Sequence, residues 1–64
     1  MLAYQIIYHT KYNDTFVTLF EESEKQKAFD CYDYTKMQKY VTSAMLIELD
    51  APNCHGKILK TFRE

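Results

Sequence analysis

Residues 15–26 read TFVTLFEESEKQ, and the period of the sequence changes inside this stretch. Thr15 to Phe20 contains β-branched, aromatic and aliphatic residues, which favour a strand. Ser23 and Gln26 have the spacing of a capping box, in which each side chain bonds the other residue's backbone amide at the start of a helix. The stretch therefore predicts a strand that is followed directly by a helix.

The chain before this stretch predicts a partner strand. Leu2 to Thr10 is rich in β-formers and alternates between two faces, as a strand does. One face carries Leu2, Tyr4, Ile6 and Tyr8, and the other carries Ala3, Gln5, Ile7 and His9. Asn13-Asp14 is a turn signal, because both residues tolerate the left-handed conformation. We expect a hairpin with its loop at Lys11 to Asp14.

The chain after this stretch predicts one helix and two more strands. A stripe at helical spacing ends near Met37 or Gln38 and consists of Ala28, Cys31, Tyr32 and Thr35, flanked by Phe29. Tyr40 to Leu49 alternates with two apolar faces, one of them Val41, Ser43, Met45, Ile47 and Leu49, which favours a central strand. Asp50 to Gly56 is expected to form a loop in which Gly56 is able to take a positive φ. Lys57 to Arg63 predicts a last strand with Ile58 and Phe62 on one face and Leu59 on the other.

These elements predict a single α+β domain over residues 1–64, in the order ββαββ. The helix after the second strand lets the third strand return antiparallel beside the first. We therefore expect a four-stranded antiparallel sheet of order 2-1-3-4 with one helix packed on one face. The other face has no second layer.

Size and composition exclude several classes of protein. A chain of 64 residues needs nearly all of its apolar side chains for one core, so little remains to wall a catalytic cleft of roughly 300 Å³ or more. The single glycine excludes a glycine-rich phosphate loop. No apolar run approaches the roughly 18 residues of a membrane span, and Met1 to Tyr4 lacks a secretion signal. Two cysteines are few for a secreted scaffold, which favours the cytoplasm and reduced thiols, although a Cys31–Cys54 bridge stays open.

Candidate catalytic and metal-binding groups are weak. Cys54 and His55 are adjacent and point to opposite sides of an extended chain, so they do not readily form an ion pair. His9, Cys31, Cys54 and His55 lack the spacing of a zinc site. The acidic residues lack a calcium loop. We expect no enzyme activity, no metal and no cofactor.

Acidic residues gather where the second strand gives way to the helix. Residues 14–33 carry a net charge of −4, and residues 34–64 carry +2. The cluster is either a solvated helix face or an anionic surface that docks on a basic groove or mimics nucleic acid. Its members are Glu21, Glu22, Glu24, Asp30 and Asp33.

Six tyrosines in 64 residues suggest contact area, because tyrosine is enriched at interfaces. The residues expected to supply it are Tyr4, Tyr8, Tyr12 and Tyr34. An uncovered sheet face with this aromatic area favours a partner. The alternatives are plain packing and the stacking of single-stranded bases. Base stacking is disfavoured because the first strand carries no internal lysine or arginine.

The second strand is a further candidate contact. Thr15 to Phe20 contains no charge or proline that would block pairing, so its edge could accept a strand from another chain.

The chain resembles small phage-encoded accessory proteins in size, charge layout and order of elements. The resemblance is carried by Asp14 to Phe20, the acidic capped helix, Ala44 to Leu49 and Gly56 to Leu59. Such proteins bind and block one host enzyme, for example RNA polymerase or a defence nuclease, without catalysis of their own. The resemblance implies a cytoplasmic inhibitor or anti-defence role in the host, and it assigns no role to any one residue.

The sequence thus predicts a non-enzymatic protein that binds a larger protein through an acidic, tyrosine-rich surface. One alternative is a homodimer whose sheet faces pack together, as a structural or regulatory module. A second alternative is a single-stranded nucleic-acid binder.

Overall fold

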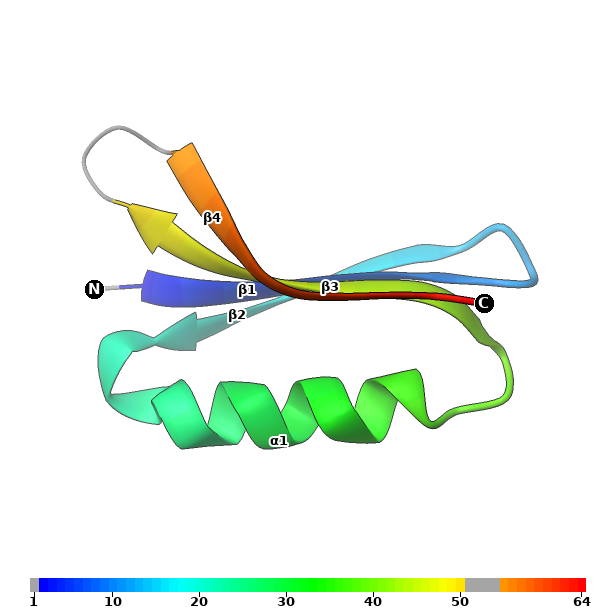
Figure 1. Ribbon diagram of the computed structural model, residues 1–64, viewed down its shortest axis with the longest axis horizontal. Coiled ribbons are helices and arrows are strands. Elements are labelled where there is room, and N and C mark those ends of the chain that lie inside the picture. Colours follow the sequence, from blue (N-terminus) through cyan, green and yellow to red (C-terminus); the bar gives the residue numbers. More distant parts are fainter. Residues whose placement is uncertain (1, 51–54) are drawn as a thin grey trace.

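The computed structural model describes residues 2–50 and 55–64 and has the predicted α+β architecture. Its four strands are β1 (Leu2–Thr10), β2 (Thr15–Glu21), β3 (Val41–Asp50) and β4 (His55–Arg63). They pair antiparallel in the order β2-β1-β3-β4. The helix α1 (Lys25–Lys36) runs along one face of this sheet, and the opposite face has no covering layer in the described chain (Figure 1).

The β1–β2 hairpin has the predicted loop. Asn13 lies in the left-handed region with φ 66°, as its turn role requires. The Thr10 hydroxyl accepts hydrogen bonds from the amides of Tyr12 and Asp14, at 3.2 and 3.3 Å. The loop is thereby closed by backbone and side chain together.

The junction between β2 and α1 differs from the predicted capping box of Ser23 and Gln26. β2 continues to Glu21, and a 3₁₀ turn (Glu22–Glu24) precedes the helix. Glu24 reaches back to accept a hydrogen bond from the Glu21 amide at 2.9 Å, in a capping box two residues earlier than expected. Ser23 lies inside the 3₁₀ turn, so the predicted capping box was wrong by two residues.

The core lies between α1 and the sheet, and the predicted helix stripe faces it. Ala28, Tyr32 and Thr35 are buried, and Phe29 and Cys31 pack against the core from its margin. The buried apolar side chains on the sheet are Tyr4, Ile6, Phe20, Val41, Ala44 and Leu46. Cys31 is a free thiol. Cys54 lies outside the described residues, as do residues 51–54 of the loop expected over Asp50 to Gly56; Asp50 ends β3, and His55 and Gly56 begin β4.

Two β-bulges overturn part of the expected face assignment. Thr10 pairs with Val41 whereas His9 pairs with Ser43, so Thr42 is an extra residue in β3. Val41 therefore turns to the helix side and is buried, although strict alternation placed it with Ser43.

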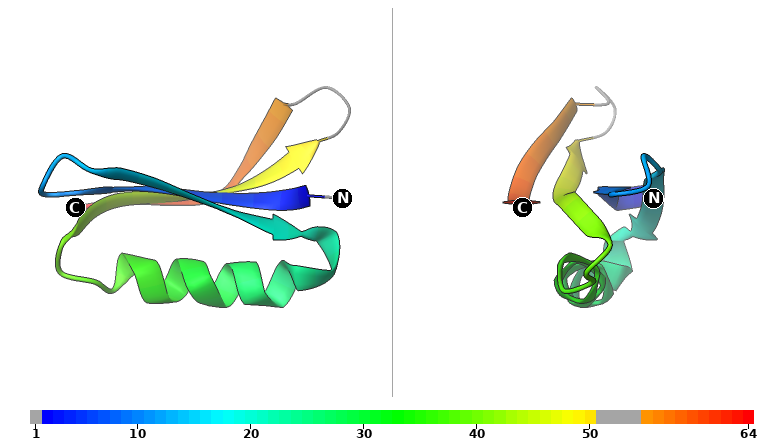
Figure 2. Two further views of the ribbon diagram at one scale, coloured as in Figure 1. Left: turned by 180° about the vertical axis from the view of Figure 1, so that it is seen from behind. Right: turned by 90° about the vertical axis from the view of Figure 1, so that its right-hand side faces the viewer.

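The second bulge lies in β4. Leu46 pairs with Lys60 and Ile47 with Ile58, so Leu59 is the extra residue. Ile58 and Phe62 consequently lie on opposite faces, contrary to the prediction. Bulges increase local twist, and the β3–β4 hairpin curls away from the plane of β1 and β2 (Figures 1 and 2).

Gly56 has a role other than the expected left-handed turn. It lies in β4 opposite Leu49, and its φ is not positive. A Cβ at this position would collide with the Cγ2 atom of Ile47. The glycine therefore admits close packing of Ile47 against the β4 backbone. In the described residues, no helix is long and apolar enough to cross a membrane.

Candidate interaction surfaces

The uncovered side of the sheet, here called the open face, is aliphatic. Cross-strand partners share a face, so the pairing assigns its residues in three rows. The rows are Thr15–His9–Ser43–Arg63, Val17–Ile7–Met45–Thr61 and Leu19–Gln5–Ile47–Ile58. Two of the three rows are mostly apolar and cross all four strands.

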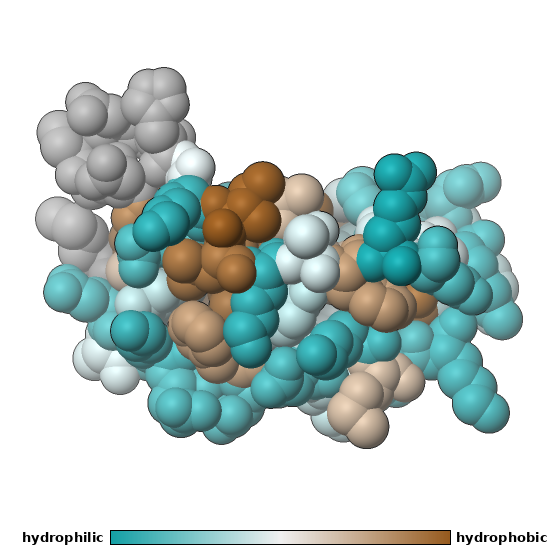
Figure 3. Space-filling model, in the orientation of Figure 1, coloured by the Kyte–Doolittle hydropathy of each residue, from teal (hydrophilic) through white to brown (hydrophobic). Residues whose placement is uncertain are grey.

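Several of these apolar side chains are strongly exposed. Val17 is 53% exposed, Leu19 47% and Ile58 56%. Figure 3 looks at the sheet from its β4 edge and shows hydrophobic side chains gathered over the first half of β4, with hydrophilic side chains around them. Single exposed apolar residues are ordinary, but a continuous patch on a sheet marks a contact surface.

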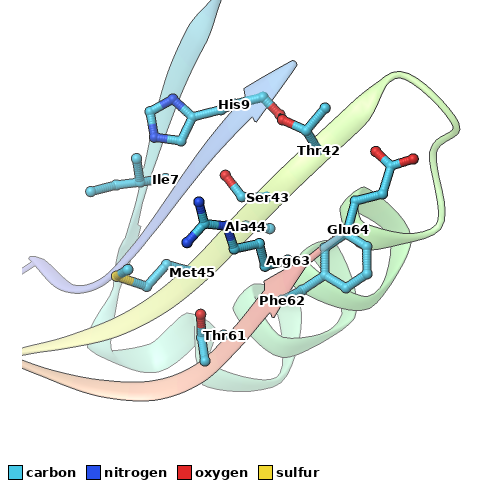
Figure 4. A pocket seen from close by; sticks show the side chains of 10 residues that line it. All are labelled: Ile7, His9, Thr42, Ser43, Ala44, Met45, Thr61, Phe62, Arg63 and Glu64. Carbon is cyan, nitrogen blue, oxygen red and sulfur yellow. The ribbon is translucent and has the colours of Figure 1, made fainter. Parts of the chain in front are cut away.

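The polar row of the open face borders a half-open hollow of about 790 Å³. Its side chains on this face are Ile7, His9, Ser43, Met45, Thr61 and Arg63 (Figure 4). This hollow is larger than the roughly 300 Å³ of a small catalytic cleft, but it is open to solvent on one side. The space comes from the curl of the sheet and not from an enclosed cleft.

Arg63 is the cation of this hollow. Its guanidinium extends from β4 across β3 toward β1 (Figure 4). Among the side chains that the structure describes, no carboxylate forms an ion pair with it. A guanidinium presents a planar fork of donors that matches a carboxylate, so Arg63 is suited to an acidic group, and Glu64 is the one carboxylate among the lining residues of the hollow.

His9 and Ser43 are neighbours in the same hollow but are not arranged as a nucleophile and its base. The Nδ1 atom of His9 and the hydroxyl of Thr15 on β2 are hydrogen bonded at 2.8 Å. Ser43 lies on β3, on the other side of β1. In the described part of the chain no hydrogen bond joins the two side chains, whereas nucleophilic catalysis depends on that contact.

The acidic residues lie on the helix side of the molecule and largely serve the local structure. The Glu24 carboxylate accepts a hydrogen bond from the Glu21 amide and forms an ion pair with the Lys27 ammonium at 3.4 Å. The hydrogen bond from the Glu21 amide, together with Lys27, lowers the pKa of the Glu24 carboxyl.

The other two acids of the helix also have local partners. Asp30 accepts a hydrogen bond from Gln26 at 3.0 Å, and Asp33 pairs with Lys36 at 3.5 Å. Glu21 and Glu22 are exposed at the junction. These acids therefore do not share a surface with the open face.

The tyrosines do not line the open face, contrary to the expectation. Tyr4 is only 6% exposed and packs edge-on against Phe29, with ring centroids 6.4 Å apart. Tyr8 stacks on Phe16 at 5.1 Å on the same helix side. Burial raises the pKa of Tyr8, with smaller contributions from Tyr40 and Cys31.

Two of the named tyrosines are available to a partner. Tyr12 in the hairpin loop is 67% exposed, and Tyr34 on α1 is 69% exposed. They belong to separate elements and do not form part of the open face.

An uncovered face was expected, but its aliphatic character was not, because β1 and β3 are apolar on both sides and alternation does not show which side the helix covers. The signal that was present is the pair Val17 and Leu19 on the second strand, which alternate with Thr18 and Phe20. A comparison of the chain with protein-family models, curated proteins and solved structures found no match. Within the described residues, no group of three or more metal-ligating side chains is placed to hold a metal ion.

Proposed function

We propose that this protein acts by binding a larger protein, without catalysis, and that the open face makes the contact. The observation that carries the proposal is the half exposure of Val17, Leu19 and Ile58 on one continuous aliphatic surface. Keeping such a surface in water is unfavourable by about 25 cal/mol per Å² of apolar area. A partner that covers it recovers this free energy.

The side chains of the open face indicate what kind of surface the partner presents. The apolar rows fit an apolar patch on the partner, and Arg63 at one end fits a carboxylate beside that patch. The hydroxyls of Ser43 and Thr61 line the same hollow and supply further hydrogen bonds to an acidic group. The partner surface is therefore apolar with an acidic residue at its border.

The acidic residues and exposed tyrosines take a secondary part in this proposal. The acids at the start of α1 and along it lie on the helix side, where they repel an acidic partner surface and so disfavour docking on that side. Tyr12 and Tyr34 lie outside the main contact. A cytoplasmic inhibitor of a host enzyme, as in the phage accessory proteins that the chain resembles, is the biological role that we propose for such a binder.

The side chains that line the hollow support a non-enzymatic function. Its histidine is engaged with Thr15, and its serine has no base in hydrogen-bond contact among the described side chains. Its cation is a guanidinium, which binds anions but does not exchange protons near neutral pH.

The test is capture from a lysate of the source cells or their host, followed by affinity measurement with the purified captured protein. Ile58→Asp places a charge at the β4 end of the aliphatic row, and we expect binding to weaken by roughly tenfold or more. Asp30→Lys, on the exposed side of α1, is the matched control and is expected to change affinity much less. Circular dichroism checks that both variants fold.

Wild-type affinity in Ile58→Asp together with lost binding in Asp30→Lys would overturn the open face as the contact. It would instead favour the acidic surface. If Arg63→Gln loses binding and Ile58→Asp keeps the wild-type affinity, the contact is restricted to the hollow.

A further inference from the structure

The outer edge of β2 is unprotected, in contrast to the outer edge of β4. β2 is the last strand on its side of the sheet and pairs with β1 alone. It has no charge or proline from Thr15 to Phe20, and six of its seven residues are exposed. β4 carries Lys57, Lys60 and Arg63 and a bulge, which are the usual means of preventing edge-to-edge pairing.

The sequence of β2 is self-complementary about Thr18. Reading outward from Thr18, the two sides carry Val17 and Leu19, then Phe16 and Phe20. Antiparallel pairing of two copies about this residue places aliphatic beside aliphatic, aromatic beside aromatic and threonine beside threonine. Such cross-strand pairs each contribute roughly 0.2–1 kcal/mol relative to alanine pairs.

We propose that two copies of this chain pair through β2 in antiparallel register about Thr18, forming one eight-stranded sheet. In this register Thr15 lies opposite Glu21 of the second copy, and no two like charges face each other. Every pair joins residues of the same face, so both helices lie on one side of the joint sheet. The outward backbone groups of β2 then gain hydrogen-bond partners.

The helix leaves room for this pairing. α1 packs mostly on β3 and less on β1 and β2, and the end-on view places it beneath the middle of the sheet (Figure 2). Adjacent strands are about 4.8 Å apart, so the two helices are separated by the β1 and β2 strands of both copies. Thr18 itself lies on the helix side and is exposed.

Pairing would also enlarge the open face. The Cα trace measures 33 × 21 × 15 Å, and the shortest dimension lies across the strands (Figure 1). One open face is therefore about 15 Å wide across the strands. Joining two copies brings Val17 and Leu19 of both chains together at the centre of a surface about twice as wide.

The test uses charge at the symmetry axis. In the paired state Thr18→Lys places two lysines directly opposite each other, and Thr18→Asp does the same with two aspartates. We expect the wild-type chain to sediment as a dimer that dissociates on dilution, and each variant to sediment as a monomer at the same concentration. An equimolar mixture of the two variants is expected to return to the dimer mass.

Thr61→Lys on the opposite edge strand is the matched control and should leave the dimer mass unchanged. Thr18→Cys adds a test of register that needs no added charge. In a Cys31→Ser, Cys54→Ser background it should form a disulfide-linked dimer on mild oxidation, and Thr15→Cys, which lies opposite residue 21, should not. This pair of variants decides the register if the charged variants fail to fold.

A wild-type chain that is monomeric at all concentrations would overturn the proposal. A Thr18→Lys variant that remains dimeric would overturn it too, and would point to packing of the two open faces. A mixture of the charged variants that stays monomeric would contradict the register. The binding experiment with Ile58→Asp is independent, because Ile58 lies on β4.

Discussion

Glu24 is the acidic residue whose local task is clearest. Its carboxylate accepts a hydrogen bond from the Glu21 amide at 2.9 Å and contacts the Lys27 ammonium at 3.4 Å. Both contacts favour the ionised form, so the pKa in the folded chain lies below the usual 4.5. An acid at a junction is thus explained by backbone amides that need an acceptor, without any partner protein.

The pH dependence of stability follows from the direction of that shift. A lowered pKa in the folded state means that the contribution of Glu24 is present above pH 4.5 and is lost as the pH falls through the lowered value. We predict that Glu24→Gln melts at a lower temperature than wild type at pH 7, and that the difference narrows on acidification. Lys27→Gln, which keeps the amide contact, should show a smaller difference. An equal difference in melting temperature between wild type and Glu24→Gln at pH 7 and pH 3 would show that the carboxylate charge does not contribute to stability.

At the scale of elements, the hairpin turn depends on one residue with positive φ. Asn13 has φ 66°, a conformation that costs other non-glycine residues about 1–2 kcal/mol. The turn determines which residues of β2 lie opposite those of β1, and hence which side chains reach the open face.

We predict that Asn13→Ala destabilises the fold by about 1 kcal/mol and lowers the melting temperature by roughly 4–8 °C. Asn13→Gly, which adopts this φ without strain, should stay near wild type. Thermal unfolding followed by circular dichroism measures both. If the alanine and glycine variants have the same melting temperature, the turn does not require a left-handed conformation at this position.

Strands and helix were predictable because their periods differ and local residues set them. The bulges at Thr42 and Leu59 were not, because an extra residue in one strand is defined only against its neighbour. Each bulge changes the face of the residues beyond it, which explains why Val41 is in the core and why Ile58 is separated from Phe62.

For the whole molecule, the decisive fact is which side of the sheet the helix covers. β1 offers Tyr4 and Ile6 on one side and Ile7 on the other, so alternation alone does not choose between them. The helix takes the side with Tyr4, which removes the expected tyrosine surface and leaves an aliphatic one. The prediction of a surface binder stays a proposal, and its location moves from the acids and tyrosines to the open face.

The most direct test is amide chemical-shift mapping of the ¹⁵N-labelled chain with its captured partner. We predict that the largest changes fall on the open face, at Ile7, Met45, Ile47, Ile58 and Arg63. Changes concentrated instead along α1, at Glu22, Asp30 and Asp33, would contradict the open face as the binding surface.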